Sequence, residues 1–169
     1  MTNTNTFRSV VAMALSGAVM FAASTAQAGI VGHVGNGATG GTFAAGKRGV
    51  AGNAHTTTQN SNGTTTVTNA GGFAGANGSR GAHQGTTTAG AGAYSHTGSA
   101  SASGANGSVQ TSGGFSRAAN GTWSGSRATS ATNARTGNSY NGSTAIDPTT
   151  GKPVHTGTCT NASGATIAC

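Results

Sequence analysis

Residues 138–169 read NSYNGSTAIDPTTGKPVHTGTCTNASGATIAC, and this stretch predicts the fold most directly. In the segment 146–152, Asp147 can accept hydrogen bonds from backbone amides of a turn, Pro148 supplies a preset φ, and Gly151 allows a positive φ at the exit. The residues on either side are β-branched or small, which suits strands. The segment therefore predicts a β-hairpin.

A second hairpin is expected over residues 159–169. An odd-length loop centred on Gly164 would place Cys159 directly opposite Cys169. Directly opposed residues on antiparallel strands have Cβ atoms about 4.5–5.5 Å apart, close to the distance that a disulfide requires. We therefore predict a Cys159–Cys169 disulfide, with two free thiols as the alternative.

The N-terminus predicts export. A basic residue precedes an apolar run at 10–23, and Ala26-Gln27-Ala28 then places small residues where a signal peptidase cleaves. The alternative is a membrane anchor, but the run is shorter than the ~20 apolar residues that span a bilayer. We predict a signal peptide at 1–28, cleaved between Ala28 and Gly29, and a secreted, periplasmic or cell-surface location. Disulfides persist in such compartments.

The composition limits the size of any hydrophobic core. The chain contains 31 glycines, only 5% charged residues and only 5% aromatic residues. Ordering each backbone residue costs ~1–2 kcal/mol of conformational entropy, which so few large side chains offset poorly. We expect a marginally stable or partly disordered chain after the signal peptide. No amphipathic helix is expected there, because glycine disfavours helices.

Turn signals recur about every 14–15 residues, as in a chain of short structural repeats. We expect a flexible glycine-rich linker at 29–41, low-complexity β repeats at 42–137, and the two hairpins at 138–169. The predicted turns lie at Asn62-Gly63, Asn77-Gly78, Ala91-Gly92, Asn106-Gly107, Asn120-Gly121, 135–137 and Thr150-Gly151.

Two all-β architectures fit this spacing. Asn-Gly is typical of a two-residue type I′ hairpin turn, in which both residues have positive φ. This preference favours an antiparallel β-meander of short Gly/Ser/Thr-rich strands, partly disordered. A β-solenoid with one coil per repeat is the alternative.

The residue types exclude several kinds of chemistry. Asp147 is the only acidic residue, so paired-carboxylate catalysis and carboxylate-rich calcium or magnesium sites are excluded. No Gly-x-Ser-x-Gly nucleophile motif occurs in a strand-to-helix context. We predict that the protein is not an enzyme and binds no cofactor.

Histidines are the remaining candidate metal ligands. Their positions are scattered, without the short-spaced pairs of zinc sites. His83 and His96 could meet across a hairpin centred near Gly90, but solvent-facing side chains are the simpler interpretation. The five histidines are His33, His55, His83, His96 and His155.

The chain is basic, with a net charge of +7 that falls to +6 when Arg8 leaves with the signal peptide. Positive charge attracts polyanions such as an anionic envelope or matrix polysaccharide. The basic residues are spread along the sequence rather than clustered, so no specific nucleic-acid site is expected. No later segment is apolar enough to span a membrane as a helix.

The signal peptide, the Asn-Gly repeats and the cysteine-closed tail together resemble exported, low-complexity Gly/Ser/Thr/Asn-rich bacterial proteins. This resemblance is compositional and implies no site residues. Six Asn-x-Ser/Thr sequons nearly coincide with the turns, so we interpret them as turn chemistry. The sequons begin at Asn62, Asn77, Asn106, Asn120, Asn141 and Asn161.

These observations favour an exported, non-enzymatic structural or surface protein that self-associates or binds envelope or matrix polymers. The alternative is a periplasmic binding protein for metal ions or an anionic ligand. An ice-binding surface ranks third, because consecutive residues of the Thr-Thr-Thr runs point to opposite faces of a strand instead of forming one array.

Overall fold

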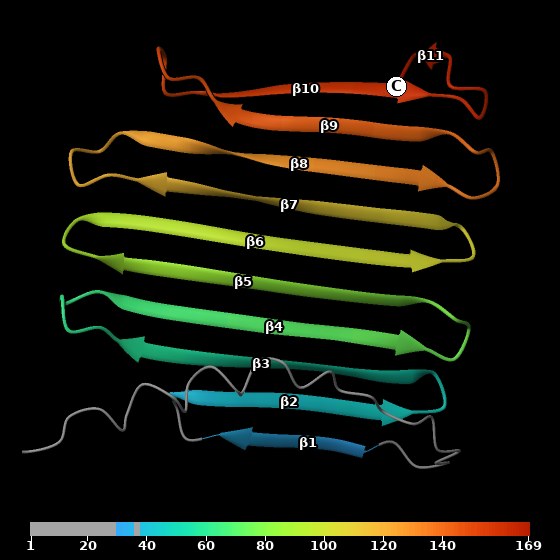
Figure 1. The fold of residues 1–169 in the computed structure, drawn as a ribbon. Helices are drawn as coiled ribbons and strands as arrows, with labels where there is room; N and C mark the ends of the chain where they lie inside the picture. The colour runs from blue at the N-terminus through green and yellow to red at the C-terminus, as the bar shows by residue number, and fades with distance from the viewer. Residues whose placement is uncertain (1–29, 36–37) are drawn as a thin grey trace, which may run out of the picture.

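The protein forms one open antiparallel sheet in meander order, as Figure 1 shows. The structure, a computed structural model, describes residues 30–35 and 38–169. Each strand pairs with the strands before and after it in sequence, which confirms the meander prediction over the solenoid. The strands are β1 (Ile30–Gly35), β2 (Thr39–Gly46), β3 (Gly49–Gln59), β4 (Thr65–Gly75), β5 (Arg80–Gly90), β6 (Ala93–Gly104), β7 (Gly107–Arg117), β8 (Trp123–Asn133), β9 (Ser139–Ile146), β10 (Pro153–Thr160) and β11 (Thr166–Ile167).

The predicted turns lie where the sequence places them, except that Ala105 and Asn106 form the turn predicted at Asn106-Gly107, because Gly107 already pairs with Gly104 in β7. Most of these turns are not of type I′. Ala91 is the only non-glycine residue with positive φ in the described chain, so only Ala91-Gly92 has the type I′ signature. At Asn62-Gly63 the loop has three residues instead of two. The amide of Asn60 donates to the carbonyl of Thr64 at 2.8 Å, and the amide of Gly63 donates to the carbonyl of Asn60 at 3.0 Å. This is a type I turn that ends in a left-handed glycine.

The asparagine of this loop keeps a negative φ, and its side chain accepts hydrogen bonds from the residue after the glycine. Asn62 Oδ1 accepts hydrogen bonds from the amide of Thr64 at 3.1 Å and from its hydroxyl at 2.7 Å. Asn77 and Ser79 repeat both bonds, at 3.1 and 2.6 Å. The Asn-Gly-Ser/Thr pattern is therefore explained here by turn geometry.

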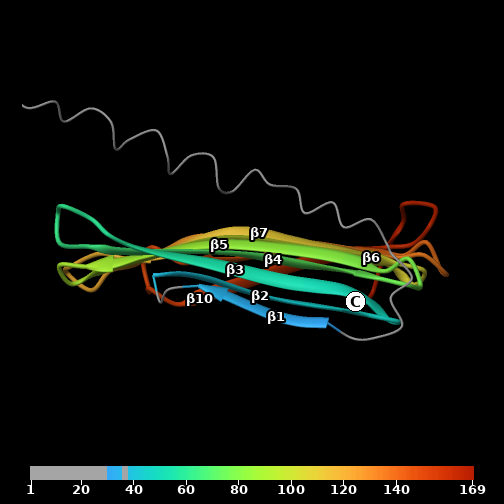
Figure 2. The ribbon, with the colours of Figure 1, turned by 90° about the horizontal axis from the view of Figure 1, so that it is seen from below.

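The sheet is a single layer, and Figure 2 shows it from the edge. None of the described residues is a buried hydrophobic residue, so the fold has no conventional core in this part of the chain. Large apolar side chains remain substantially exposed, among them Phe73 at 44% and Trp123 at 42%. Backbone hydrogen bonds between strands therefore hold the sheet together, as the composition predicts.

The N-terminal part of the sheet differs from the expected linker at 29–41. Strand β1 and the start of β2 occupy this range and pair from Ile30 opposite Ala45 to Gly35 opposite Gly40. The ring of Phe43 covers the space beside Gly32, its direct partner, so glycine here accommodates a neighbouring side chain. The predicted signal peptide at 1–28 and its cleavage site at Ala28 and Gly29 lie outside the described residues.

The C-terminal part contains both predicted hairpins and the predicted disulfide. Cys159 and Cys169 are bonded, with Cα atoms 5.3 Å apart. Their predicted register is wrong, because Cys159 pairs with Ile167 instead of Cys169. The reason is the loop. The amide of Asn161 donates to the carbonyl of Ala165 at 2.9 Å, so the residue opposite Cys159 is Ile167, two residues before Cys169.

Candidate functional site: two faces of one sheet

The strand registers assign each side chain to one of two faces. Partners across an antiparallel ladder lie on the same face, and successive residues along a strand alternate. Phe73, for example, pairs with Ala51 on β3 and with Gly81 on β5, so these three residues share a face. Following the pairs from strand to strand sorts the side chains into rows that cross the whole sheet.

One face carries most of the aromatic side chains, and we call it the aromatic face. It contains Phe73, Tyr94, Phe115, Trp123 and Tyr140. One of its rows is made entirely of apolar or small residues and Tyr140, and crosses ten strands. From β2 to β11 that row is Ala44, Ala51, Phe73, Gly81, Ala102, Val109, Ala131, Tyr140, Cys159 and Ile167.

A second apolar group lies toward the other end of the strands on the aromatic face. The rings of Tyr94 and Trp123 have centroids 6.3 Å apart and planes tilted by 57°. Phe115 pairs with His96 and lies two residues from the row that holds these rings. Arg117 pairs with both Tyr94 and Trp123 and lies between them in that row. The apolar side chains of this face thus form two strips, the second interrupted by Arg117, with a more polar band between them.

Several rings on this face lie over glycines instead of standing away from the sheet. A Cβ added at Gly71 would come within 2.6 Å of Cε1 of His83, and one added at Gly157 within 2.8 Å of Cε2 of Tyr140. The ring of Phe73 lies in the same way over Gly81. A glycine next to each of these three rings lets the ring lie flat on the sheet.

All five histidines lie on the aromatic face, where they are spread over several strands. The turn at Ala91-Gly92 pairs His96 with Thr87 and His83 with Ala100. His83 and His96 are therefore four residue positions apart along the strands, roughly 13 Å, and do not meet. No group of three or more metal-capable side chains occurs among the described residues.

Two histidines are held by hydroxyl groups on this face. His155 contacts the hydroxyl of Tyr140 through Nε2 at 2.9 Å and the hydroxyl of Thr144 through Nδ1 at 3.0 Å. Nδ1 of His96 lies 2.8 Å from the hydroxyl of Thr87. These contacts are consistent with structural roles.

The opposite face is dominated by serine and threonine, and we call it the hydroxyl face. Its cross-strand partners bond to each other, as Thr66 does to Thr88 at 3.1 Å and Ser139 to Thr160 at 2.7 Å. Most of its side chains are small and uncharged. Its hydroxyl residues include Thr56, Thr58, Thr68, Thr86, Ser95, Thr97, Ser99, Ser112, Ser116, Ser124, Ser126, Thr132, Ser143 and Thr156.

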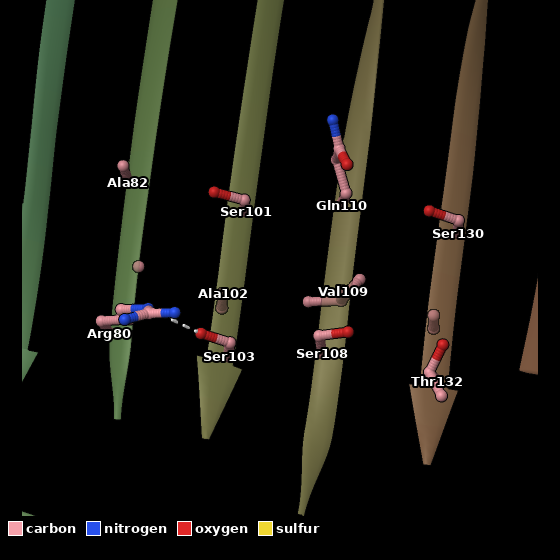
Figure 3. Close-up of a pocket in the computed structure, with 12 residues that line it drawn as sticks. Arg80, Ala82, Ser101, Ala102, Ser103, Ser108, Val109, Gln110, Ser130 and Thr132 are labelled. Atoms are coloured by element: carbon pink, nitrogen blue, oxygen red, sulfur yellow. Dashed lines mark hydrogen bonds between the residues drawn. The ribbon is translucent and has the colours of Figure 1, made fainter. Parts of the chain in front are cut away.

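A shallow depression of about 340 Å³ lies on the sheet near one end of β5–β8. Figure 3 shows its polar rows, with Ser101, Gln110 and Ser130 in one and Arg80 and Ser103 in the next. Arg80 Nε donates to the hydroxyl of Ser103 at 3.2 Å. The depression offers hydrogen bonds and the single positive charge of Arg80 to a ligand, and none of its lining residues is acidic.

The charged residues do not gather at one place. Arg80 lies on the hydroxyl face, while Arg117 and Arg127 lie on the aromatic face. The only carboxylate side chain, Asp147, caps its own turn, accepting from the amides of Thr149 at 2.7 Å and Thr150 at 3.2 Å. These two bonds hold the pKa of the Asp147 carboxyl below its ordinary value.

Comparisons with protein families, curated proteins and solved structures found no match to this chain. No helix in the described part of the chain is long and apolar enough to cross a membrane. The disulfide indicates an oxidising environment. The geometry of the two faces is therefore the basis for a functional assignment.

Sequence reasoning missed the separation of the two faces. The signal was present in threonines spaced two residues apart, as in Thr56 and Thr58 or Thr66 and Thr68, because such pairs share a face. What the spacing could not reveal is which rows of neighbouring strands align.

Proposed function

We propose that this chain is an exported structural protein whose copies associate face to face through the aromatic face. The observation that carries the proposal is the position of the exposed apolar side chains. Six large apolar side chains of the described residues are exposed, and four of them lie on the aromatic face: Phe73, Tyr94, Val109 and Trp123. The other two, Phe43 and Val154, lie far apart on the hydroxyl face. Exposed apolar side chains that gather on one face in this way are typical of an interaction site.

The area of the aromatic face is sufficient for a stable interface. Eleven strands at ~4.8 Å spacing give a width of about 50 Å, and ten residues at ~3.4 Å give a length of about 34 Å. Their product, about 1,700 Å², is roughly twice the ~800 Å² per partner of a standard interface. A second copy can therefore be accommodated even if only half of the face is covered.

The relief of the aromatic face also suits such an interface. Rings that lie over glycines, such as Phe73 over Gly81, leave a low surface on which a second sheet can pack at ~10 Å. Two copies that present the same face form an isologous, closed dimer. The two apolar strips then become a core shared between two sheets.

Export supports the structural assignment. The predicted signal peptide at 1–28 directs the chain out of the cytoplasm. The Cys159–Cys169 disulfide persists in the oxidising compartments outside it. The alternative of a periplasmic binding protein for metal ions or an anionic ligand receives less support, because neither the histidines nor the basic side chains converge on one site.

Analytical ultracentrifugation of the exported protein tests the proposal. The wild type is expected to sediment as a dimer or larger assembly. The variant Phe73→Ser/Val109→Ser/Trp123→Ser is expected to be monomeric. Its matched control, Phe43→Ser/Val154→Ser, removes exposed apolar side chains from the hydroxyl face and is expected to sediment like the wild type.

Circular dichroism must show unchanged β structure in both variants, so that loss of assembly is not loss of folding. A wild-type protein that stays monomeric at all accessible concentrations would overturn the proposal. Equal dissociation of the control would overturn the choice of face.

A further inference from the structure

Two rows of threonine run side by side across the hydroxyl face. On each of β3 to β6 two hydroxyl residues spaced two apart share this face, and the registers align them with the corresponding residues of the neighbouring strands. The first row, on β2–β6, is Thr39, Thr56, Thr68, Thr86 and Thr97. The second row, on β3–β6, is Thr58, Thr66, Thr88 and Ser95. We call these nine residues the threonine array.

The threonine array is periodic in two directions. Neighbouring strands repeat it at ~4.8 Å, and residues two apart on one strand repeat it at ~6.8 Å. Each threonine is stiff at χ1 because it is β-branched. The hydrogen bond between Thr66 and Thr88, at 3.1 Å, further orders the second row. The hydroxyl and methyl groups are therefore pre-organised in a regular lattice.

We propose that the threonine array binds ice. A site that repeats in two directions matches a ligand that repeats in two directions, and the surface of crystalline water is such a ligand. Its molecules repeat at spacings close to those between strands and between alternate residues of a strand. Threonine suits this surface, because its hydroxyl can take the place of a lattice water while its methyl group orders the adjacent ones.

The surroundings of the array favour ice over other repeating ligands. The array contains no charged residue, and Arg80 lies six positions away along the strand from Thr86, so a mineral or anionic polymer has no counter-charge there. A crystalline polysaccharide would be expected to stack on aromatic rings. Phe43, the aromatic side chain on this face, lies four positions from Thr39.

The row beside the array leaves it accessible. On β3 and β4 this row consists of Ala54 and Ala70, whose short side chains do not project above Thr56 and Thr68. On β5 it holds Gln84, a longer exposed side chain two positions from Thr86. The array also lies opposite the aromatic face, so it would remain outward if copies associate through the latter. Ice binding therefore does not depend on the proposed association.

The test measures thermal hysteresis, the gap between the melting and freezing temperatures of ice, and inhibition of ice recrystallisation by the exported protein. The wild type is expected to show both. The variants Thr68→Tyr and Thr86→Tyr place a large ring inside the array and are expected to lose most of the hysteresis. The controls Thr57→Tyr and Val67→Tyr introduce the same ring one residue from an array position, on the aromatic face, and are expected to retain the hysteresis.

Circular dichroism and an intact disulfide establish that each variant is folded, and sedimentation reports separately on association. A folded wild type without hysteresis or recrystallisation inhibition would overturn the proposal. So would equal loss of activity in array variants and controls, or binding to crystalline chitin or cellulose in the absence of any effect on ice.

Discussion

The ring of Phe73 on β4 lies over Gly81, its direct cross-strand partner on β5. A side chain at Gly81 would occupy the space that the ring fills. This pairing of a ring with an opposed glycine recurs at Gly71 beside His83 and gives the aromatic face its low relief.

Replacing Gly81 with valine should therefore displace the Phe73 ring. Overpacking of this kind typically costs ~1–3 kcal/mol of folding free energy. The measurement is urea denaturation followed by circular dichroism. The control is Gly104→Val, where an added Cβ would meet only Ser79 at 3.4 Å. Equal destabilisation by the two changes would show that the Phe73 contact is not the cause.

Gly63 should be needed for its backbone conformation alone. Its φ is 77°, and no atom lies within 4 Å of an added Cβ. Gly63→Ala should cost ~1–2 kcal/mol, the usual penalty for a left-handed residue with a side chain. Gly63→Asn should cost less, since asparagine tolerates this conformation better. Thermal or urea unfolding of both variants measures the difference, and the same loss in each would contradict the argument.

Reduction of the Cys159–Cys169 disulfide should affect the end of the sheet and not its centre. In the chain-entropy model, closing a loop of this size contributes roughly 2–3 kcal/mol. Because β11 pairs only with the end of β10, we expect faster hydrogen exchange at the amide of Asn161 and little change in β4–β7. Loss of protection across the central strands would show that the disulfide supports the entire sheet.

The turn at Asp147 should weaken in acid. The hydrogen bonds from the amides of Thr149 and Thr150 lower the pKa of this carboxyl in the folded state. Its stabilising effect is therefore complete above the pKa of the unfolded chain and is lost as the pH falls through the folded pKa. An NMR titration should give an Asp147 midpoint below that of a disordered peptide containing the same residues.

The variant Asp147→Asn provides the control for this titration, because it keeps an acceptor oxygen without a titrating group. Its turn should be insensitive to pH over the same range. A wild-type midpoint at or above the peptide value would contradict the geometry.

Export should remove residues 1–28. Intact-mass measurement of the exported protein is expected to give a chain that begins at Gly29. The change Ala28→Phe should block processing, because signal peptidases require a small residue at this position. An exported wild-type chain that retains Met1 would contradict the signal-peptide prediction.

The sequence by itself determined the features that depend on neighbouring residues. Asn62-Gly63 and Asn77-Gly78 mark their turns because glycine alone readily takes the left-handed conformation there, and Asp147 caps its own turn. The even spacing of these signals fitted both a meander and a solenoid, and the preference of Asn-Gly for hairpin turns favoured the meander, although most of the turns are not of type I′. The two cysteines, ten residues apart, were close enough for their bond to be predicted, although not their register.

Only the tertiary structure decided which side chains share a face. A register shift of one residue moves every side chain of a strand to the other face, and register depends on the length of each loop. The three-residue loop around Asn62-Gly63 sets Thr66 opposite Thr58, and the two-residue loop at Ala91-Gly92 sets Ser95 opposite Thr88. The sequence does show that alternate residues of each threonine run share a face. Which threonines of neighbouring strands lie opposite each other is set by the registers of all the intervening strand pairs.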